Sequence, residues 1–268
     1  MGDRLAGKNA IVVGAGQTAG TTIGNGRATA ILFAREGARV LLVDRDSDSV
    51  QETLGLIELE APGTASVFVA DIVDEAQCEA IVARALETFG GRIDVLHNNV
   101  GIGAGDGGPT SLAADAWDRI VDTNTKAMWL TCKHVVPVMR AQRGGAIVNI
   151  SSIAAIAGVG NLTAYKVSKA GVNALTQALA VTNARFGIRV NAIMPGLIDT
   201  PMAVDAAARA RGVDREIVAD ARARTVPLGH QGTAWDIAHA ALFLASDDAA
   251  FITGVVLPVD GGQSAQVG

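Results

Sequence analysis

The chain has 268 residues, of which 49% are hydrophobic, and its formal net charge at neutral pH is -5. This length and hydrophobic content suffice for one sizeable core, so we expect a single domain over residues 1–268. Because the chain is acidic and has no basic stripe to bind a phosphate backbone, we expect no nucleic-acid partner. No apolar run reaches the roughly 20 residues that a membrane span needs, so we expect no membrane association.

The cysteines and histidines indicate neither a disulfide framework nor a metal site. Only Cys78 and Cys132 are present, both within helical patterns, which is typical of buried thiols in a reducing compartment. Because the N-terminus carries no apolar leader, we expect a cytoplasmic protein. No metal is expected, because the four histidines lack metal-ligand spacing: His97, His134, His230 and His239.

Short β-branched segments alternate with longer segments of helical period along the whole chain. This alternation is typical of βαβ units, and the almost continuously apolar strand segments indicate a parallel sheet covered by helices on both faces. We therefore predict an α/β fold with a doubly wound, seven-stranded parallel sheet of the Rossmann type. The predicted strands are 9–16, 39–44, 66–71, 92–98, 145–151, 188–196 and 254–260.

The segment 197–232 is too long for an ordinary connection between a strand and the next element. We predict that it forms a helical lid. Its arginines could bind an acidic substrate, but a solvated helix face is the favoured interpretation because Asp and Glu lie among them. These arginines are Arg209, Arg211, Arg215, Arg222 and Arg224.

A glycine-rich turn, "GAGQTAGTTIGNGRATA" (14–30), follows the first predicted strand and fits a dinucleotide-binding fingerprint in two registers. One register begins at Gly14, and the other places Gly24 and Gly26 directly before the better helix. We favour the second, because a helix beginning near Ala19 would contain several glycines, each costing about 1 kcal/mol relative to alanine. The helix start would then bind a pyrophosphate. A plain flexible turn is the alternative, and the missing Gly-Lys-Ser/Thr ending excludes a P-loop.

Asp44 ends the second predicted strand, 20 residues after Gly24. At this spacing an acidic side chain accepts hydrogen bonds from the adenosine ribose hydroxyls. A carboxylate there also repels a 2′-phosphate, which favours NAD over NADP. NADP stays open as the alternative, because Arg45 could hold a 2′-phosphate if Asp44 turned away.

Tyr165 is the only tyrosine of the chain, and Lys169 follows it by one helical turn on the same face. At roughly 5 Å and an effective dielectric constant of about 20, the ammonium would lower the pKa of the phenol by about two units, toward about 8. Such a phenol suits general acid/base catalysis. A tyrosine that only packs its ring is the alternative. The hydroxyl of Ser152 lies at the end of the fifth strand, at the edge where such sheets bind ligands.

Ordered motifs over nearly the whole chain resemble those of the short-chain dehydrogenases/reductases. Several motifs at compatible spacing are far more specific than one, and the chain is identified as a member of this family. The motifs are "GNGRATA" at 24–30, "VD" at 43–44, "ADI" at 70–72, "HNNVG" at 97–101, "VDTN" at 121–124, "IVNISS" at 147–152, "YKVSK" at 165–169, "IRVNAIMPG" at 188–196 and "ITGVVLPVDGG" at 252–262.

The resemblance implies a catalytic tetrad of Asn124, Ser152, Tyr165 and Lys169. Tyr165 would exchange a proton with the substrate oxygen, which Ser152 would hydrogen-bond. Lys169 would lower the pKa of the phenol and hold the nicotinamide ribose, and Asn124 would anchor a water in the proton relay. The cofactor-binding residues expected from the glycine turn and the resemblance are Gly14, Gly24, Gly26, Asp44, Asp71, Ile72, Asn98, Gly101, Tyr165, Lys169, Pro195, Gly196, Ile198 and Thr200.

The chain also departs from the family pattern. Its glycine turn is several residues longer than the common form and begins after Val13, where threonine is usual, and Val100 replaces the commoner alanine. These differences leave the conformation of the turn over the pyrophosphate open.

We expect an NAD-dependent enzyme that interconverts a secondary alcohol and a ketone. The alternatives are an NADPH-dependent carbonyl reductase of the 3-oxoacyl type and, less favoured, a non-catalytic nucleotide sensor or scaffold. Substrate selectivity is expected in 101–109, in 153–162 and in the lid. The candidate lining residues are apolar: Ile153, Val159, Leu162, Met202 and Val204.

The resemblance further suggests a homotetramer. The predicted helices around 113–142 and 164–186 would pair across subunits, and 243–262 would supply a second interface.

Overall fold

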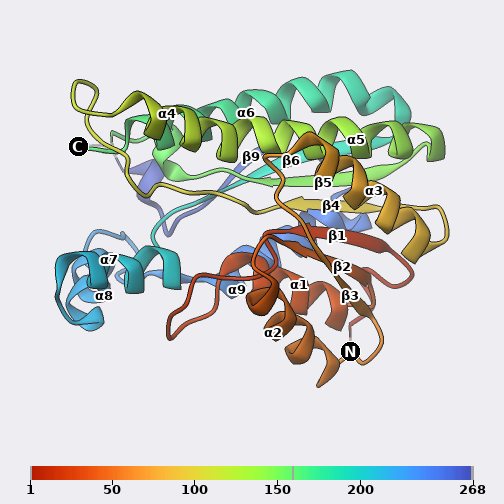
Figure 1. Cartoon of the computed structure of the whole chain (residues 1–268), viewed down its shortest axis with the longest axis horizontal. Helices are drawn as coiled ribbons and strands as arrows, with labels where there is room; N and C mark the ends of the chain where they lie inside the picture. Colours follow the sequence, from red (N-terminus) through yellow and green to blue (C-terminus); the bar gives the residue numbers. More distant parts are fainter. Residues whose placement is uncertain (1, 159, 267–268) are drawn as a thin grey trace.

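A parallel sheet forms the centre of the computed structural model, which describes residues 2–158 and 160–266. In this part of the chain the sheet has seven strands in the order β3-β2-β1-β4-β5-β6-β9 (Figure 1). The strand order reverses between β1 and β4, which confirms the predicted doubly wound α/β fold. The strands are β1 (Asn9–Val13), β2 (Arg39–Asp44), β3 (Ala65–Val69), β4 (Val95–Asn98), β5 (Gly145–Ile150), β6 (Ile188–Pro195) and β9 (Val256–Val259).

Helices cover both faces of this sheet (Figure 1). On one face lie α1 (Asn25–Arg35), α2 (Ser47–Glu58) and α9 (Ala234–Ala245). On the other face lie α3 (Glu75–Phe89), α4 (Ala114–Val121), α5 (Ala127–Gln142) and α6 (Thr163–Asn183). Short 3-10 turns occur at Ile153–Ala155, Ala184–Phe186, Asp247–Ala249 and Gln263–Ala265.

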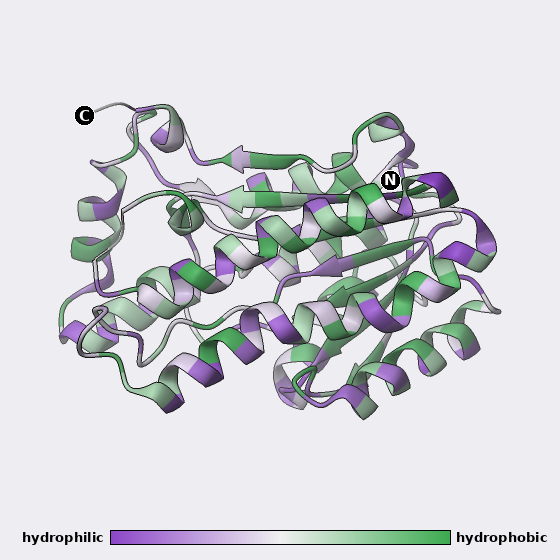
Figure 2. Cartoon of the chain, turned by 90° about the horizontal axis from the view of Figure 1, so that it is seen from above, coloured by the Kyte–Doolittle hydropathy of each residue, from purple (hydrophilic) through white to green (hydrophobic). Residues whose placement is uncertain are grey.

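The apolar strands serve two cores, one on each face of the sheet. Val12 and Leu42 pack with α1 and α9, whereas their neighbours Ile11 and Leu41 pack with α3 and α5. Successive side chains of a strand point to opposite faces. A strand between two helical layers is therefore mostly apolar, as the predominantly hydrophobic strands in Figure 2 show.

The segment predicted as a lid folds into short elements at one end of the molecule (Figure 1). Its order is β7 (Ile198–Asp199), a π-helix (Pro201–Asp205), α7 (Ala206–Arg211), α8 (Arg215–Ala223) and β8 (Gly232–Thr233). β7 and β8 form a separate parallel pair. Two-residue strands carry no periodicity, which is why the sequence predicted the helices but not this pair.

Among the helices described, none combines the length and the apolar composition that crossing a bilayer requires.

Candidate functional site

The glycine-rich turn is built by a close contact between α1 and the end of β1. α1 begins at Asn25, with Gly24 as its N-cap, so the helix begins where the favoured register places it. A Cβ atom added to Gly26 would lie 1.8 Å from the carbonyl oxygen of Gly14, which itself has φ +80°. Only glycine fits at Gly26, because any side chain would displace the helix from the strand end.

The long loop between Gly14 and Gly24 is held by polar contacts to its neighbours. Its backbone at Gln17 exchanges two hydrogen bonds with the hydroxyl of Ser49, at 2.8 and 2.9 Å. The buried guanidinium of Arg27 binds the Ser49 carbonyl oxygen at 2.8 Å and the Thr53 hydroxyl at 2.9 Å. Sequence reasoning missed Arg27 and Ser49, because no local pattern reveals contacts between α1 and α2.

Asp44 lies at the carboxyl end of β2, beside this loop. Its Oδ2 accepts a hydrogen bond from the Gly16 N–H at 2.9 Å, and its Oδ1 accepts one from the Asp46 N–H at 3.1 Å. Arg45 is exposed. The carboxylate is thus oriented toward the glycine loop by two backbone donors.

The next predicted cofactor residues use their side chains within the protein. Ile72 packs in the apolar core, and Asp71 Oδ1 accepts the Val73 N–H at 3.1 Å. Asn98 is buried, and its amide binds the Asn149 side chain at 3.0 Å and the Thr131 hydroxyl at 2.9 Å. The Asn98 and Ile72 side chains are therefore engaged inside the protein.

The end of β6 continues into the lid through the remaining predicted residues. Pro195 is paired with Val259 of β9, and a Cβ atom on Gly196 would lie 2.5 Å from the Gln263 Oε1 atom. Ile198 and Thr200 are buried at the base of the lid. These residues join the sheet edge to the segment predicted to cover it.

Tyr165, Ser152 and Lys169 lie together where β5 meets α6. The Lys169 side chain is 2% exposed, and its Nζ donates to the Ile150 carbonyl oxygen at 2.9 Å. This Nζ lies 5.8 Å from the centre of the Tyr165 ring. A Cβ atom on Gly101 would approach it to 2.8 Å, so Gly101 also borders the ammonium.

The pKa of the phenol is governed by burial. Burial raises the pKa of Tyr165 above its ordinary value, and an interaction with the Ser152 hydroxyl lowers it only in part. Burial also lowers the pKa of Lys169 to about 8. In this arrangement the expected lowering of the phenol pKa by Lys169 is therefore not found: burial raises the pKa of Tyr165, and the Lys169 ammonium binds the Ile150 carbonyl instead.

Asn124 lies in a π-helical turn, Asp122–Lys126, between α4 and α5. Its Oδ1 accepts the Ile102 N–H at 2.7 Å, and its Nδ2 donates to the Ile102 carbonyl at 2.9 Å and to the Ser168 hydroxyl at 3.0 Å. The side chain thus ties the loop after β4 to the helix that carries Tyr165. π-turns often occur at functional sites.

Asp106, which sequence reasoning missed, caps the helix that carries Tyr165. Its carboxylate accepts the backbone N–H of Ala164 at 3.1 Å and that of Tyr165 at 2.8 Å. The Thr163 hydroxyl donates to the adjacent Gly107 carbonyl at 2.8 Å. A capping residue normally precedes its own helix, so a cap from 58 residues upstream of Ala164 is invisible to a local search.

The residues predicted to line the substrate site differ in how far they are buried. Ile153 and Leu162 are half-buried and Met202 is exposed, whereas Val204 is fully buried with Ala208 and Val218 inside the lid. Val204 therefore does not line a pocket, and Val159 lies outside the described residues.

Two of the lid arginines are structural, which corrects the prediction of a solvated face. Arg215 pairs with Asp199 of β7, and Arg222 Nε binds the Gln231 side chain at 2.6 Å. Arg209, Arg211 and Arg224 are exposed.

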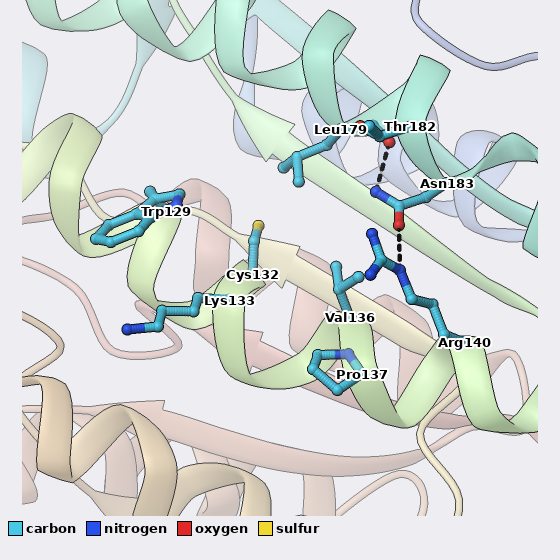
Figure 3. A pocket seen from close by; sticks show the side chains of 9 residues that line it. All are labelled: Trp129, Cys132, Lys133, Val136, Pro137, Arg140, Leu179, Thr182 and Asn183. Atoms are coloured by element: carbon cyan, nitrogen blue, oxygen red, sulfur yellow. Dashed lines mark hydrogen bonds between the residues drawn. The ribbon is translucent and has the colours of Figure 1, made fainter.

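A hollow of about 220 Å³ lies between α5 and α6, away from Tyr165 (Figure 3). Trp129, Val136 and Leu179 supply its apolar part, and Arg140 closes one end by bonding Asn183 at 2.7 Å.

The residues at the carboxyl edge fit a nicotinamide dinucleotide. Gly26 leaves room for a close backbone approach, and Gly24 at the N-cap has no side chain to cover the first N–H groups of α1. The Lys169 ammonium has three donors, of which one binds a carbonyl among the described residues. A ribose hydroxyl is a suitable acceptor for another.

Removing the carboxylate of Asp106 should loosen the start of α6. We expect Asp106→Ala to lower the free energy of unfolding by about 1 kcal/mol, as for other lost helix caps, and Asp106→Asn to retain most of it. Urea denaturation measures the change, and hydrogen exchange should become faster at the Ala164 and Tyr165 amides. The control is Asp115→Ala, because Asp115 is exposed and bonds only its neighbour Ala116 among the described residues. Unchanged exchange at Tyr165 would contradict the capping role.

Comparison with known proteins agrees with this geometry. The family described as "Enoyl-(Acyl carrier protein) reductase" matches residues 19–264. Levodione reductase of Leifsonia aquatica is 40% identical over 90% of this chain and 91% of its own. A solved structure of levodione reductase superposes with a TM-score of 0.92 at 37% identity, over 98% of this chain and 100% of that one.

Two further relatives match almost the whole chain. The 3-oxoacyl-[acyl-carrier-protein] reductase FabG of Thermotoga maritima is 37% identical over 97% of this chain and 98% of its own. The cis-4-hydroxycyclohexanecarboxylate dehydrogenase of Sinomonas cyclohexanicum is 37% identical over 99% of this chain and 100% of its own. Together with the doubly wound sheet and the motifs at its carboxyl edge, these matches show that the chain is an oxidoreductase of the short-chain dehydrogenase/reductase family.

Proposed function

We propose that the protein is an NAD-dependent dehydrogenase that interconverts a secondary alcohol and a ketone. The observation that carries this proposal is the grouping of Tyr165, Ser152 and the buried Lys169 at the carboxyl edge of the sheet. The three residues provide a proton donor, a hydrogen-bond donor and a buried cation within one site. These are the groups that a developing alkoxide requires.

The chain's own residues divide the work in this proposal. Tyr165 takes the hydroxyl proton during oxidation and returns it during reduction, and Ser152 hydrogen-bonds the same substrate oxygen. Lys169 holds the nicotinamide ribose with its free donors. Asn124 fixes Ile102 and Ser168 around the site through its three hydrogen bonds. When bound, the nicotinamide supplies the hydride exchange.

A secondary alcohol on a six-membered carbocycle is the substrate class we favour. Support comes from the relative named for a hydroxycyclohexanecarboxylate, which matches this chain end to end. The half-buried Ile153 and Leu162 near Tyr165 suit an apolar ring. Reduction of a 3-oxoacyl chain with NADPH is the second candidate, supported by the similarity to FabG.

Replacing the tyrosine tests the mechanism. Tyr165→Phe should lower kcat/KM for NAD reduction by cyclohexanols about a thousandfold, because general acid/base groups contribute roughly 10²- to 10⁴-fold. Oxidation needs the phenolate, and burial raises the pKa of Tyr165. The oxidation rate should therefore rise with pH through the alkaline range, whereas ketone reduction, which needs the phenol, should be flat near neutrality and fall at high pH.

The control for this experiment is NADH binding, followed by fluorescence, which the substitution should leave unchanged. An active Tyr165→Phe protein, or an oxidation rate independent of pH, would show that another group exchanges the proton.

The preference for NAD is assigned to Asp44, whose carboxylate two backbone N–H groups orient toward the glycine loop. We expect the protein to bind NADH at least about tenfold more tightly than NADPH, and Asp44→Ala to remove this preference by abolishing repulsion of the 2′-phosphate. Titration of both nucleotides measures it, with the exposed Asp48→Ala as the control. Tighter binding of NADPH by the unmodified protein would contradict the assignment and favour a role for Arg45.

Self-association through α5 and α6, up to a homotetramer, is also part of this proposal. Val181 of α6 is 83% exposed, and Trp129 of α5, which lines the hollow of Figure 3, is 43% exposed. Exposed apolar side chains of this size are typical of interfaces between subunits. We expect Val181→Glu to shift the sedimentation coefficient toward that of a monomer. The control is Leu59→Glu, because Leu59 is exposed at the end of α2, and this substitution should leave the sedimentation coefficient unchanged. An unmodified protein that sediments as a monomer would exclude the assembly.

A cytoplasmic location completes the proposal, supported by the free, buried thiols of Cys78 and Cys132.

A further inference from the structure

The lengthened glycine loop reaches the lid. The Thr21 N–H donates to Asp205 Oδ1 at 3.0 Å, and the Thr21 hydroxyl lies 3.2 Å from the same oxygen. The Arg209 guanidinium donates to the Ala19 carbonyl at 3.2 Å. Two successive parts of the lid, the π-helix Pro201–Asp205 and α7, therefore contact one loop.

Asp205 is held from both sides. Its side chain is 8% exposed, and its second oxygen lies 3.4 Å from Arg215 Nε. Burial raises its pKa, but the donors of Thr21 and the charge of Arg215 outweigh this effect, so its pKa is lowered. Arg215 also pairs with Asp199 of β7. The carboxylate thus links Thr21 to the strand from which the lid begins.

Close packing accompanies these hydrogen bonds. A Cβ atom added to Gly20 would lie 2.7 Å from the Pro201 Cβ and 2.8 Å from the Asp205 Cγ. The loop backbone therefore lies directly against the lid, with no room for a side chain at this position. The residues that lengthen the glycine loop beyond the common family form make this contact. A shorter turn would connect β1 to α1 directly and would not extend to α7.

The contact joins two segments that border the proposed cofactor-binding residues. The loop begins at the end of β1 and ends at the start of α1, whereas the lid begins at Leu197, shortly after β6 ends at Pro195. Figure 1 shows the loop after β1 and the helices α7 and α8 on the same side of the molecule. Their contact therefore joins the segment expected to bind the pyrophosphate to the segment that follows the residues expected near the nicotinamide.

We propose that Thr21 and Asp205 form a clasp between the glycine loop and the lid, which must open each time the dinucleotide enters or leaves. Asp205 is then a positioning residue for cofactor binding. The role in cofactor exchange rests on the proposed function, whereas the clasp itself is a property of the chain.

The first experiment uses the protein without nucleotide. We expect Asp205→Ala to increase amide hydrogen exchange at least tenfold in residues 16–24, and Thr21→Val, which keeps its N–H, to increase it about threefold. Asp205→Asn retains one acceptor and should give an intermediate rate. The matched controls are Thr18→Val and Asp220→Ala, because both residues are exposed on the same loop and the same lid. Equal exchange in all variants would overturn the clasp.

The second experiment measures release of NADH by stopped-flow fluorescence. Asp205→Ala should speed release at least tenfold, and Thr21→Val should do so more weakly. Adding Thr21→Val to Asp205→Ala should change nothing further, because both act on one contact. Release at the unmodified rate from Asp205→Ala, with the loop shown to be loosened, would overturn the role in cofactor exchange.

Failure of the proposed function can be distinguished from failure of the clasp. If the unmodified protein binds neither NADH nor NADPH, the proposed function fails, while hydrogen exchange still decides whether the clasp exists. Thr21→Val leaves Asp205 paired with Arg215, so it tests the clasp even where Asp205→Ala does not fold.

Discussion

Burial of a parallel sheet on both faces is the constraint on which the rest of this structure depends. Successive residues of each strand enter different cores, as Ile11 and Val12 do, so most strand positions are apolar. Reactive side chains are then left to the strand ends. Because all strands run in the same direction, the groups after β1, β2, β5 and β6 meet at one edge.

Glycine controls how closely the backbone approaches at this edge. The contact of Gly26 with the Gly14 carbonyl brings the start of α1 against the strand end, and Gly20 brings the long loop against the lid. Both positions exclude a Cβ atom for steric reasons. The same residue type thus allows a close approach of α1 to the strand end at one end of the loop and a contact with a distant segment in its middle.

The electrostatics around Tyr165 show a balance between desolvation and charge. Burial raises the pKa of the phenol and lowers that of Lys169, so both groups shift toward their neutral forms. The helix that carries Tyr165 is positioned by residues distant in the sequence. Asn124 binds Ser168, and Asp106 accepts hydrogen bonds from backbone amides at the start of α6. The loop 101–109 is therefore attached to the tyrosine's helix directly at Asp106 and Gly107, and at Ile102 through Asn124.

The sequence by itself determined the seven strands, the doubly wound fold class, the start of the helix after the glycine turn and the grouping of Tyr165 with Lys169. These features are local, because apolar periodicity and helix-start glycines act over a few residues. Tertiary structure alone decided the roles of Asp106, Arg27 and Asp205, which bind groups far away in the chain. It also decided the pKa of Tyr165, because burial depends on which segments pack around a side chain, and no spacing along the chain specifies that.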